Sequence, residues 1–389
     1  MQLTLLVVNF FLITIISREY GAETYGEYAS SKSLSVLIGT AAVMSLALVV
    51  TKLLAQKNEN SKLMFSNSYF LIFRNFLISL VILIPLTSIL NRDLSMTFLF
   101  LLGFVFNEMI HVALAYFQSR GDFVTSSKQI FLRTILYGLG AWIIVIRGFS
   151  VNTLISYQVL MLFLFLLVAH KSIPTKDVVF KIENSKNVKN ELQSSGKKMV
   201  LTTFSSALIS ELDIVLLGLF YTGPILGVLA WSRRILEIIF QLLAASLDIL
   251  FPELSKAKTK QDVSEIRTRL RRVFILSFAI PISFFLFKGL ASELFISLLG
   301  SDFSEVSTYT SWILFALPVM VWSRINIIFS RALDFEFNLT KSILFGSFVS
   351  LGIYYVMHSF ASNPAILSII FSQIFIGAIT TYSFRKSYE

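Results

Sequence analysis

The sequence predicts an all-α polytopic membrane protein, because it is more apolar than a soluble domain and its apolar runs have the length of membrane spans. Of its 389 residues, 55% are hydrophobic and 14% are charged, whereas soluble domains have about 45–50% and 25%. The mean hydropathy is +0.76. A helix needs about 20 apolar residues to cross a bilayer, and such runs recur along the whole chain. The alternating hydrophobicity of membrane barrel strands is absent.

The hydrophobic runs predict about twelve transmembrane helices in two sets of six. The first set comprises residues 2–17, 28–50, 68–90, 96–117, 129–146 and 150–170. The second set comprises residues 199–219, 225–250, 272–291, 309–329, 341–358 and 364–384. A long polar stretch separates the two sets. We therefore expect an N-terminal six-helix lobe at 1–170, a cytoplasmic linker at 171–198 and a C-terminal six-helix lobe at 199–389.

The distribution of lysine and arginine predicts the side of the membrane that each loop faces, because cytoplasmic loops carry the excess of these residues. With the amino terminus in the cytoplasm, the inner loops and the tail hold 24 of them and the outer loops hold 4. We expect a multi-pass protein of the cytoplasmic (inner) membrane with both termini on the cytoplasmic side. The net charge of +10 then reflects topology and contact with anionic lipid, and it does not indicate nucleic-acid binding.

A weak internal repeat indicates that the two sets of helices are related. At an offset of 201 residues, GEYASSKSL at 26–34 aligns with GVLAWSRRI at 227–235. Gly26 then pairs with Gly227, and Lys32 pairs with Arg233. Because each set has an even number of spans, we expect two parallel repeats that enclose a cleft.

Three stretches of the chain resemble the polysaccharide-biosynthesis flippases. They are EYGAETYGEY at 19–28, ELDIVLLGLFYTGPILGVLAWSRRI at 211–235 and LFPELSK at 250–256. These flippases are the O-antigen and exopolysaccharide repeat-unit translocases of the multidrug/oligosaccharidyl-lipid/polysaccharide exporter superfamily. The resemblance implies a V-shaped exporter of two lobes that turns a lipid-pyrophosphate-linked oligosaccharide from the inner to the outer leaflet.

Several cations lie inside predicted spans. Arg233 is eight residues into the segment 225–250, about 12 Å deep at 1.5 Å per residue. A cation at that depth costs at least about 2.5–3.5 kcal/mol and normally faces the bundle interior or water. Arginine can bind phosphate oxygens bidentately, which suits the pyrophosphate that the resemblance implies. The candidate substrate-binding residues are Arg233, Arg324, Arg234, Lys32 and Arg74. For Lys32 and Arg74, near helix ends, snorkelling to the membrane surface is the alternative.

Acidic residues in the spans have two alternative roles, an internal ion pair or a site that couples transport to an ion. Glu237 lies one turn from Arg233 on the same helix, and Asp213 lies at a similar depth on the preceding helix. Either could neutralise Arg233. Glu108 and His111 share a helix face and could take up a proton inside the membrane. A hydrogen-bonded contact between helices is the alternative for this pair.

The sequence lacks the motifs of the enzyme classes that would compete with a transporter. It has no phosphate-loop pattern, no H-E-x-x-H and no G-x-S-x-G, and its three histidines are scattered. No basic leader or cleavage site marks residues 2–17 as a signal peptide. We therefore expect no enzyme activity, no cofactor, no metal site and no direct use of ATP.

The leading prediction is a flippase that moves a lipid-linked oligosaccharide by alternating access, for a surface polysaccharide such as the O-antigen of lipopolysaccharide or an exopolysaccharide. Its predicted partners are the polyprenyl-pyrophosphate-linked oligosaccharide, the lipid bilayer, and a glycan polymerase with its chain-length regulator. A cation-coupled multidrug antiporter of the same superfamily is one alternative, and the buried arginines count against it. A membrane scaffold of a glycan-assembly complex, without transport, is the other.

Overall fold

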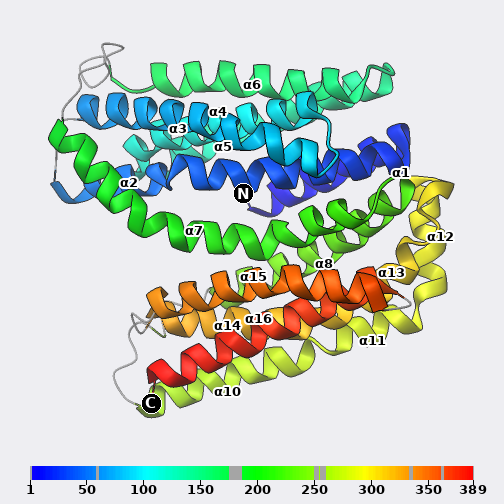
Figure 1. The fold of residues 1–389 in the computed structure, drawn as a ribbon. Helices are drawn as coiled ribbons and strands as arrows, with labels where there is room; N and C mark the ends of the chain where they lie inside the picture. Colours follow the sequence, from blue (N-terminus) through cyan, green and yellow to red (C-terminus); the bar gives the residue numbers. More distant parts are fainter. Residues whose placement is uncertain are drawn as a thin grey trace. The chain divides into compact units, whose positions relative to one another are not determined.

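The protein is helical throughout the residues that the computed structural model describes, which are 2–57, 61–174, 186–248, 254, 260–332, 336–360 and 363–388 (Figure 1). Within these ranges there is no strand, and nine helices are long and apolar enough to cross a membrane, or up to ten if a bent pair counts as one span. The longest of the nine, Val7–Gln56, contains the second predicted span and most of the first. The prediction of an all-α polytopic membrane protein is confirmed.

The chain forms two compact units. The N-terminal unit comprises Met1–Tyr20 and Glu27–Ala207, and the C-terminal unit comprises Gly21–Gly26 and Leu208–Glu389. The helices of the first unit are α1 (Gln2–Val43) except for Gly21–Gly26, α2 (Leu46–Lys57), α3 (Ser61–Ile89), α4 (Leu94–Ser119), α5 (Phe123–Ile146), α6 (Val151–Lys171) and the first part of α7 (Lys186–Phe220). The second unit contains the rest of α7, α8 (Pro224–Asp248), α10 (Lys260–Leu276), α11 (Ala279–Leu286), α12 (Lys288–Leu299), α13 (Val306–Ile313), α14 (Leu317–Ala332), α15 (Glu336–Phe360) and α16 (Pro364–Tyr388).

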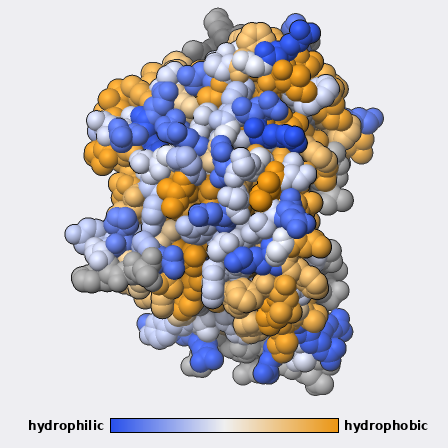
Figure 2. All heavy atoms as spheres, turned by 90° about the vertical axis from the view of Figure 1, so that its right-hand side faces the viewer, coloured by the Kyte–Doolittle hydropathy of each residue, from blue (hydrophilic) through white to orange (hydrophobic). Residues whose placement is uncertain are grey.

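The surface of the molecule is apolar along the helices. Large hydrophobic side chains such as Val81, Leu286 and Phe348 are more than 70% exposed. Hydrophilic residues gather on the face made by the helix ends at the right of Figure 1, with hydrophobic residues at its flanks (Figure 2). This distribution suits helices whose sides contact lipid and whose ends reach water.

Short polar residues fix the starts of three spans, because the first N–H groups of a helix need acceptors. The Asp93 carboxylate accepts from the N–H of Ser95 at 2.7 Å and so caps α4. The Asp122 carboxylate accepts from the N–H of Thr125 at 3.0 Å and caps α5. Ser150 caps α6 in the same way. Each span therefore begins directly after a short turn.

The cap on α5 corrects one predicted boundary. The helix begins at Phe123, whereas the sequence predicted a start at 129. Arg133 therefore lies ten residues inside α5, about 15 Å from its start at 1.5 Å per residue, and not four residues inside it as the predicted start implies.

The first two predicted spans are parts of one helical run with two breaks. α1 kinks at Gly21, where φ is 79°, so the predicted turn between the spans is a kink. A second break follows at Met44 and Ser45, with φ of 52° and 54°, a region that L-residues seldom adopt. The Ser45 hydroxyl donates to Thr203 Oγ1 on α7 at 2.7 Å. This contact helps to hold the second break in place.

Three further predicted boundaries differ from the structure. The span 272–291 is broken between α10 and α11, and the chain bends by 75° where α12 begins. The span 309–329 contains a 3₁₀ turn at Leu314–Ala316, next to Pro318, which has no N–H to donate. α7 starts at Lys186, inside the predicted linker, of which residues 175–185 lie outside the described chain. The predicted residues 249–250 also lie outside it.

Close packing at glycine joins the Gly21–Gly26 segment to α8 within the C-terminal unit. A Cβ atom on Gly227 would lie 1.8 Å from the carbonyl oxygen of Ala22, and one on Gly26 would lie 2.7 Å from the backbone nitrogen of Gly227. The rings of Tyr25 and Trp231 pack beside this contact, with centroids 5.9 Å apart. Only glycine allows the two backbones to approach so closely.

We expect Gly227→Ala to lower the thermal unfolding temperature of the purified protein, because the new methyl group would overlap backbone atoms and overpacking costs about 1–3 kcal/mol. Gly289→Ala is the matched control, since a Cβ there meets nothing within 4 Å. Equal unfolding temperatures for the two variants would contradict this account of the packing.

Candidate functional site

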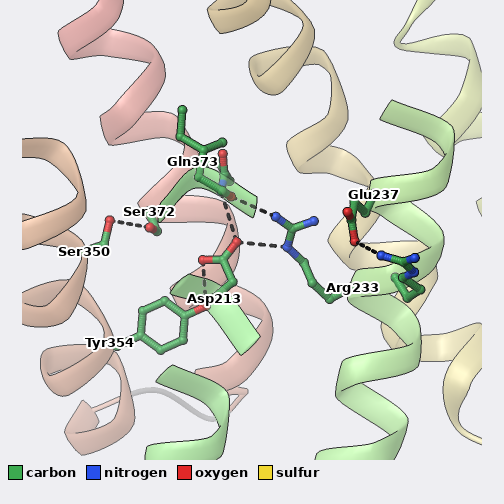
Figure 3. A network of polar contacts seen from close by, with 9 residues as sticks. Asp213, Arg233, Glu237, Ser350, Tyr354, Ser372 and Gln373 are labelled. Carbon is green, nitrogen blue, oxygen red and sulfur yellow. Dashed lines mark hydrogen bonds and ion pairs between the residues drawn. The ribbon is translucent and has the colours of Figure 1, made fainter. Parts of the chain in front are cut away.

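Arg233 is fully buried in the C-terminal unit and is paired with Asp213 (Figure 3). Its Nε donates to Asp213 Oδ2 at 3.0 Å, and its Nη2 donates to the carbonyl oxygen of Ile209 at 3.2 Å. The sequence analysis offered Asp213 as one of two partners for Arg233, and the structure forms this pair. The charge of Arg233 is therefore neutralised inside the protein.

The Asp213 carboxylate is the centre of a network that joins four helices. Besides Arg233 on α8, Tyr354 on α15 donates to Oδ1 at 3.1 Å, and Gln373 on α16 donates to Oδ2 at 3.0 Å. Figure 3 shows these groups converging on the carboxylate of α7. Both carboxylate oxygens are engaged, which lowers the cost of burying the charge, while Arg233 Nη1 has no hydrogen-bond partner among the described residues.

Arg234 makes a separate pair with Glu237. Arg234 Nη1 lies 2.6 Å from Glu237 Oε2, and Gln241 Nε2 donates to Glu237 Oε1 at 2.8 Å. Adjacent residues on a helix point about 100° apart, which explains why the neighbouring arginines have different acids. Glu237, which we also considered as a partner for Arg233, makes its direct ion pair with Arg234.

The N-terminal unit contains a cavity of about 240 Å³ between α1, α4, α5 and α6, which we call the polar pocket. Its main polar lining residues are Asn9, Lys32, Asn107, Arg133, Tyr137 and Gln158. Two of these are cations in membrane-spanning helices. Lys32 is one of the residues predicted to bind substrate, and the structure places it in this pocket.

An amide holds Arg133 in the polar pocket. Arg133 Nη1 donates to Asn107 Oδ1 at 2.7 Å, and in the described chain Arg133 makes no salt bridge within 4 Å. One turn along the same face of α5, Tyr137 donates to Gln158 Oε1 at 3.2 Å. Arginine paired with a neutral amide in a cavity keeps its charge available to an anion.

A second cavity of about 320 Å³ lies between α1, α2, α4 and α7 in the same unit, and we call it the Glu108 cavity. Glu108 and His111 both line it, together with Ser45 and Thr203 at the break between α1 and α2. Arg133 acts electrostatically on both Glu108 and His111. Phe104 lines both cavities, and the adjacent residues Asn107 and Glu108 line one each, so α4 lies between the polar pocket and the Glu108 cavity.

The remaining predicted cations lie elsewhere. Arg74 is half-buried on α3, and its Nη2 donates to Asn75 Oδ1 at 2.9 Å. Arg324 is half-buried on α14. Neither lines the two cavities. Arg133 was not among the predicted site residues, although it lies inside the predicted span 129–146, and the cap at Asp122 places it deeper in α5.

The chain is a polytopic membrane protein with a charged cavity among the helices of its N-terminal unit. The chain belongs to the polysaccharide biosynthesis protein family, whose model matches residues 35–308. No curated protein matches the sequence.

Solved structures share the fold at low sequence identity. An inward-facing multidrug resistance MATE transporter of the MOP superfamily aligns at TM-score 0.73 and 12% identity, over 97% of this chain and 93% of that one. The lipid II flippase MurJ in an inward closed conformation aligns at 0.72 and 14%, over 99% and 86%. The Vibrio cholerae MATE transporter VcmN in its bent form aligns at 0.56 and 13%, over 99% and 93%. The family model confirms the predicted polysaccharide-biosynthesis family, and these structures share the fold of this chain.

Because removal of one partner leaves a buried charge unpaired, Arg233→Met and Asp213→Leu should each destabilise the C-terminal unit by about 3–5 kcal/mol. The double variant restores neutrality and should recover part of this loss. Thermal unfolding of the three variants in one lipid mixture measures the coupling. Additive losses in the double variant would show that the two residues do not act as a pair.

Proposed function

We propose that this protein is a flippase that translocates a lipid-pyrophosphate-linked oligosaccharide repeat unit from the inner to the outer leaflet, for synthesis of a surface polysaccharide. The observation that carries the proposal is the presence of Lys32 and Arg133 in one pocket inside membrane-spanning helices. The family and the exporter fold support it. O-antigen and exopolysaccharide repeat units are the substrates that the proposal covers.

The chemistry of the polar pocket suits a phosphate that carries a sugar. Arginine and lysine donate charge-assisted hydrogen bonds to phosphate oxygens, and the amides of Asn107 and Gln158 can bond sugar hydroxyls. A pocket for a drug-sized ligand measures about 300–1,000 Å³, whereas the polar pocket measures about 240 Å³. We infer that it takes one phosphate with the adjoining sugar ring, and not the whole repeat unit.

The other predicted cations have secondary roles in this proposal. Arg233 and Arg234 are held by Asp213 and Glu237, so we assign them first to the cohesion of the C-terminal unit. Direct contact of these two arginines, of Arg324 or of Arg74 with the head group stays a prediction. So do the inner-membrane location, the cytoplasmic termini, and association with a glycan polymerase and a chain-length regulator.

The Glu108 cavity is our candidate for the coupling site. A carboxyl and an imidazole that line one cavity inside the membrane can exchange a proton. Because Arg133 interacts with Glu108, a proton bound there changes the net charge beside the polar pocket. Proton binding and anion binding are then linked.

Two alternatives are distinguishable from the flippase. A multidrug antiporter for cationic drugs would bind its substrates beside acidic groups, whereas the polar pocket contains Lys32 and Arg133. A scaffold without transport would tolerate neutralisation of these two cations. Drug susceptibility and the variants below separate the three functions.

The decisive measurement is the leaflet and the amount of lipid-linked oligosaccharide in cells that lack the gene and in cells that re-express it. We expect build-up in the inner leaflet that re-expression reverses. Unchanged amounts and sidedness, in a strain without a second flippase, would reject the flippase and favour the antiporter.

Arg133→Gln should reduce translocation about tenfold or more, because a charge-assisted hydrogen bond to phosphate is worth about 1.5–3 kcal/mol. Lys128→Gln is the control, since Lys128 is an exposed cation on the same helix outside the pocket. Both variants must be present in the membrane at the wild-type amount. Equal translocation by the two would remove Arg133 from the mechanism.

Glu108→Gln should abolish the dependence of translocation on a transmembrane pH gradient, because the amide cannot exchange a proton. The measurement is translocation of a labelled lipid-linked oligosaccharide in proteoliposomes with and without an imposed gradient. A variant that keeps the wild-type response to the gradient would exclude Glu108 as the coupling group.

A further inference from the structure

An apolar groove of about 300 Å³ lies between α1 and α5 in the N-terminal unit. Its lining includes Val8, Phe11, Leu12, Ile135, Leu139 and Trp142. Phe11, Leu139 and Trp142 are 60%, 54% and 48% exposed, so the groove opens toward the surroundings of the helices. Its lining residues are all apolar or glycine.

The same two helices line the groove and the polar pocket. On α1, Asn9 lines the polar pocket and its neighbour Val8 lines the groove. On α5, Tyr137 lines the pocket and its neighbour Gly138 lines the groove. A Cβ atom on Gly138 would lie 3.0 Å from Val8 Cγ1, so the helices touch where the two sites meet. One seam, α1–α5, therefore has a polar, cationic side and an apolar, exposed side.

We propose that the α1–α5 seam is the docking site of a polyprenyl-phosphate lipid, with its isoprenoid chain in the groove and its first phosphate in the polar pocket. This inference rests on the proposed function, because it assigns the seam to the lipid end of the same substrate. It adds a tail site and a place of entry from the bilayer that the cations alone do not define.

The two sides of the seam suit a ligand that has both an apolar chain and an anionic group, and they do not suit a soluble anion. A free sugar phosphate would use the polar pocket and leave the groove unused, and a neutral lipid would use the groove and leave Arg133 unused. A chain attached to a phosphate satisfies both sides at once, through apolar contact and charge-assisted hydrogen bonds. Ordinary phospholipid shares this chemistry, so the test must separate the isoprenoid lipid from it.

The test uses the full-length protein in nanodiscs of phosphatidylcholine and a polyprenyl phosphate with a diazirine on the isoprene unit next to the phosphate. After irradiation we expect labels within residues 8–15 and 135–142, mapped by mass spectrometry. A tenfold excess of phosphatidylglycerol over the probe should leave the labelling unchanged. Labels spread over all exposed helices, or loss of label to phosphatidylglycerol, would overturn the assignment.

Two tryptophan substitutions on α5 provide the matched comparison. Leu139→Trp fills the groove, whereas Leu132→Trp adds the same bulk at a residue of similar exposure, 52%, that does not line it. We expect Leu139→Trp to weaken polyprenyl phosphate binding about tenfold, because a few methylene groups lose their contact, and Leu132→Trp to leave it unchanged. Equal affinities would overturn the inference.

The head group is tested with uncharged polyprenol. We expect Arg133→Gln to weaken binding of polyprenyl phosphate but not of polyprenol, and Leu139→Trp to weaken both. A phosphate affinity that Arg133→Gln leaves intact would overturn the head-group half of the inference. The proposed function fails separately, through the leaflet measurement, which does not depend on where the tail lies.

Discussion

The pairing of Arg233 with Asp213 is the interaction on which the C-terminal unit depends. Helices in lipid gain little from the hydrophobic effect among themselves, so close packing and polar contacts determine how they associate. The Asp213 carboxylate accepts hydrogen bonds from α8, α15 and α16 while it belongs to α7. One buried charge therefore orients four helices, and Arg233 is the group that makes this charge tolerable.

The N-terminal unit also places cations inside membrane-spanning helices, but it accommodates their charge differently. Lys32 aligns with Arg233 in the internal repeat, yet it lines a cavity, whereas Arg233 is fully buried. Arg133, the second cation of that cavity, has an amide partner at 2.7 Å, and its carboxylate neighbour Glu108 interacts with it only at longer range. The charge of Arg233 is thus compensated by a carboxylate, whereas Arg133 lines a cavity with a neutral amide as its hydrogen-bond partner. This asymmetry is the physical basis for placing the head group in the polar pocket.

Hydrophobic run length predicted the fold well, because a bilayer imposes the length of each span, and all twelve predicted segments fall on helices where the chain is described. The similar depths of Asp213 and Arg233 along their helices also predicted Asp213 as a partner of Arg233.

The breaks at Met44 and Ser45 were missed because backbone strain has no hydropathy signal. Arg133 was missed because the predicted start at 129 placed it only four residues into the span, whereas the cap at Asp122 starts α5 at Phe123. The proximity of Asn9 on α1 to Tyr137 on α5 depends on tertiary packing, which a single sequence does not encode in any local pattern.

The chemistry of a lipid-linked substrate limits where its head group can bind. Withdrawing an isoprenoid chain from the bilayer costs about 0.8 kcal/mol for each methylene-sized group, so the chain stays in lipid while the head group crosses. A phosphate site for such a substrate must therefore lie within reach of lipid, separated from it by no more than one layer of side chains. The polar pocket meets this condition, because neighbouring residues on α1 and on α5 line the pocket on one side and the exposed groove on the other. A cation buried like Arg233 does not meet it without a rearrangement of the helices around Asp213. The geometry of the seam thus favours the N-terminal unit as the first contact of the substrate with the protein.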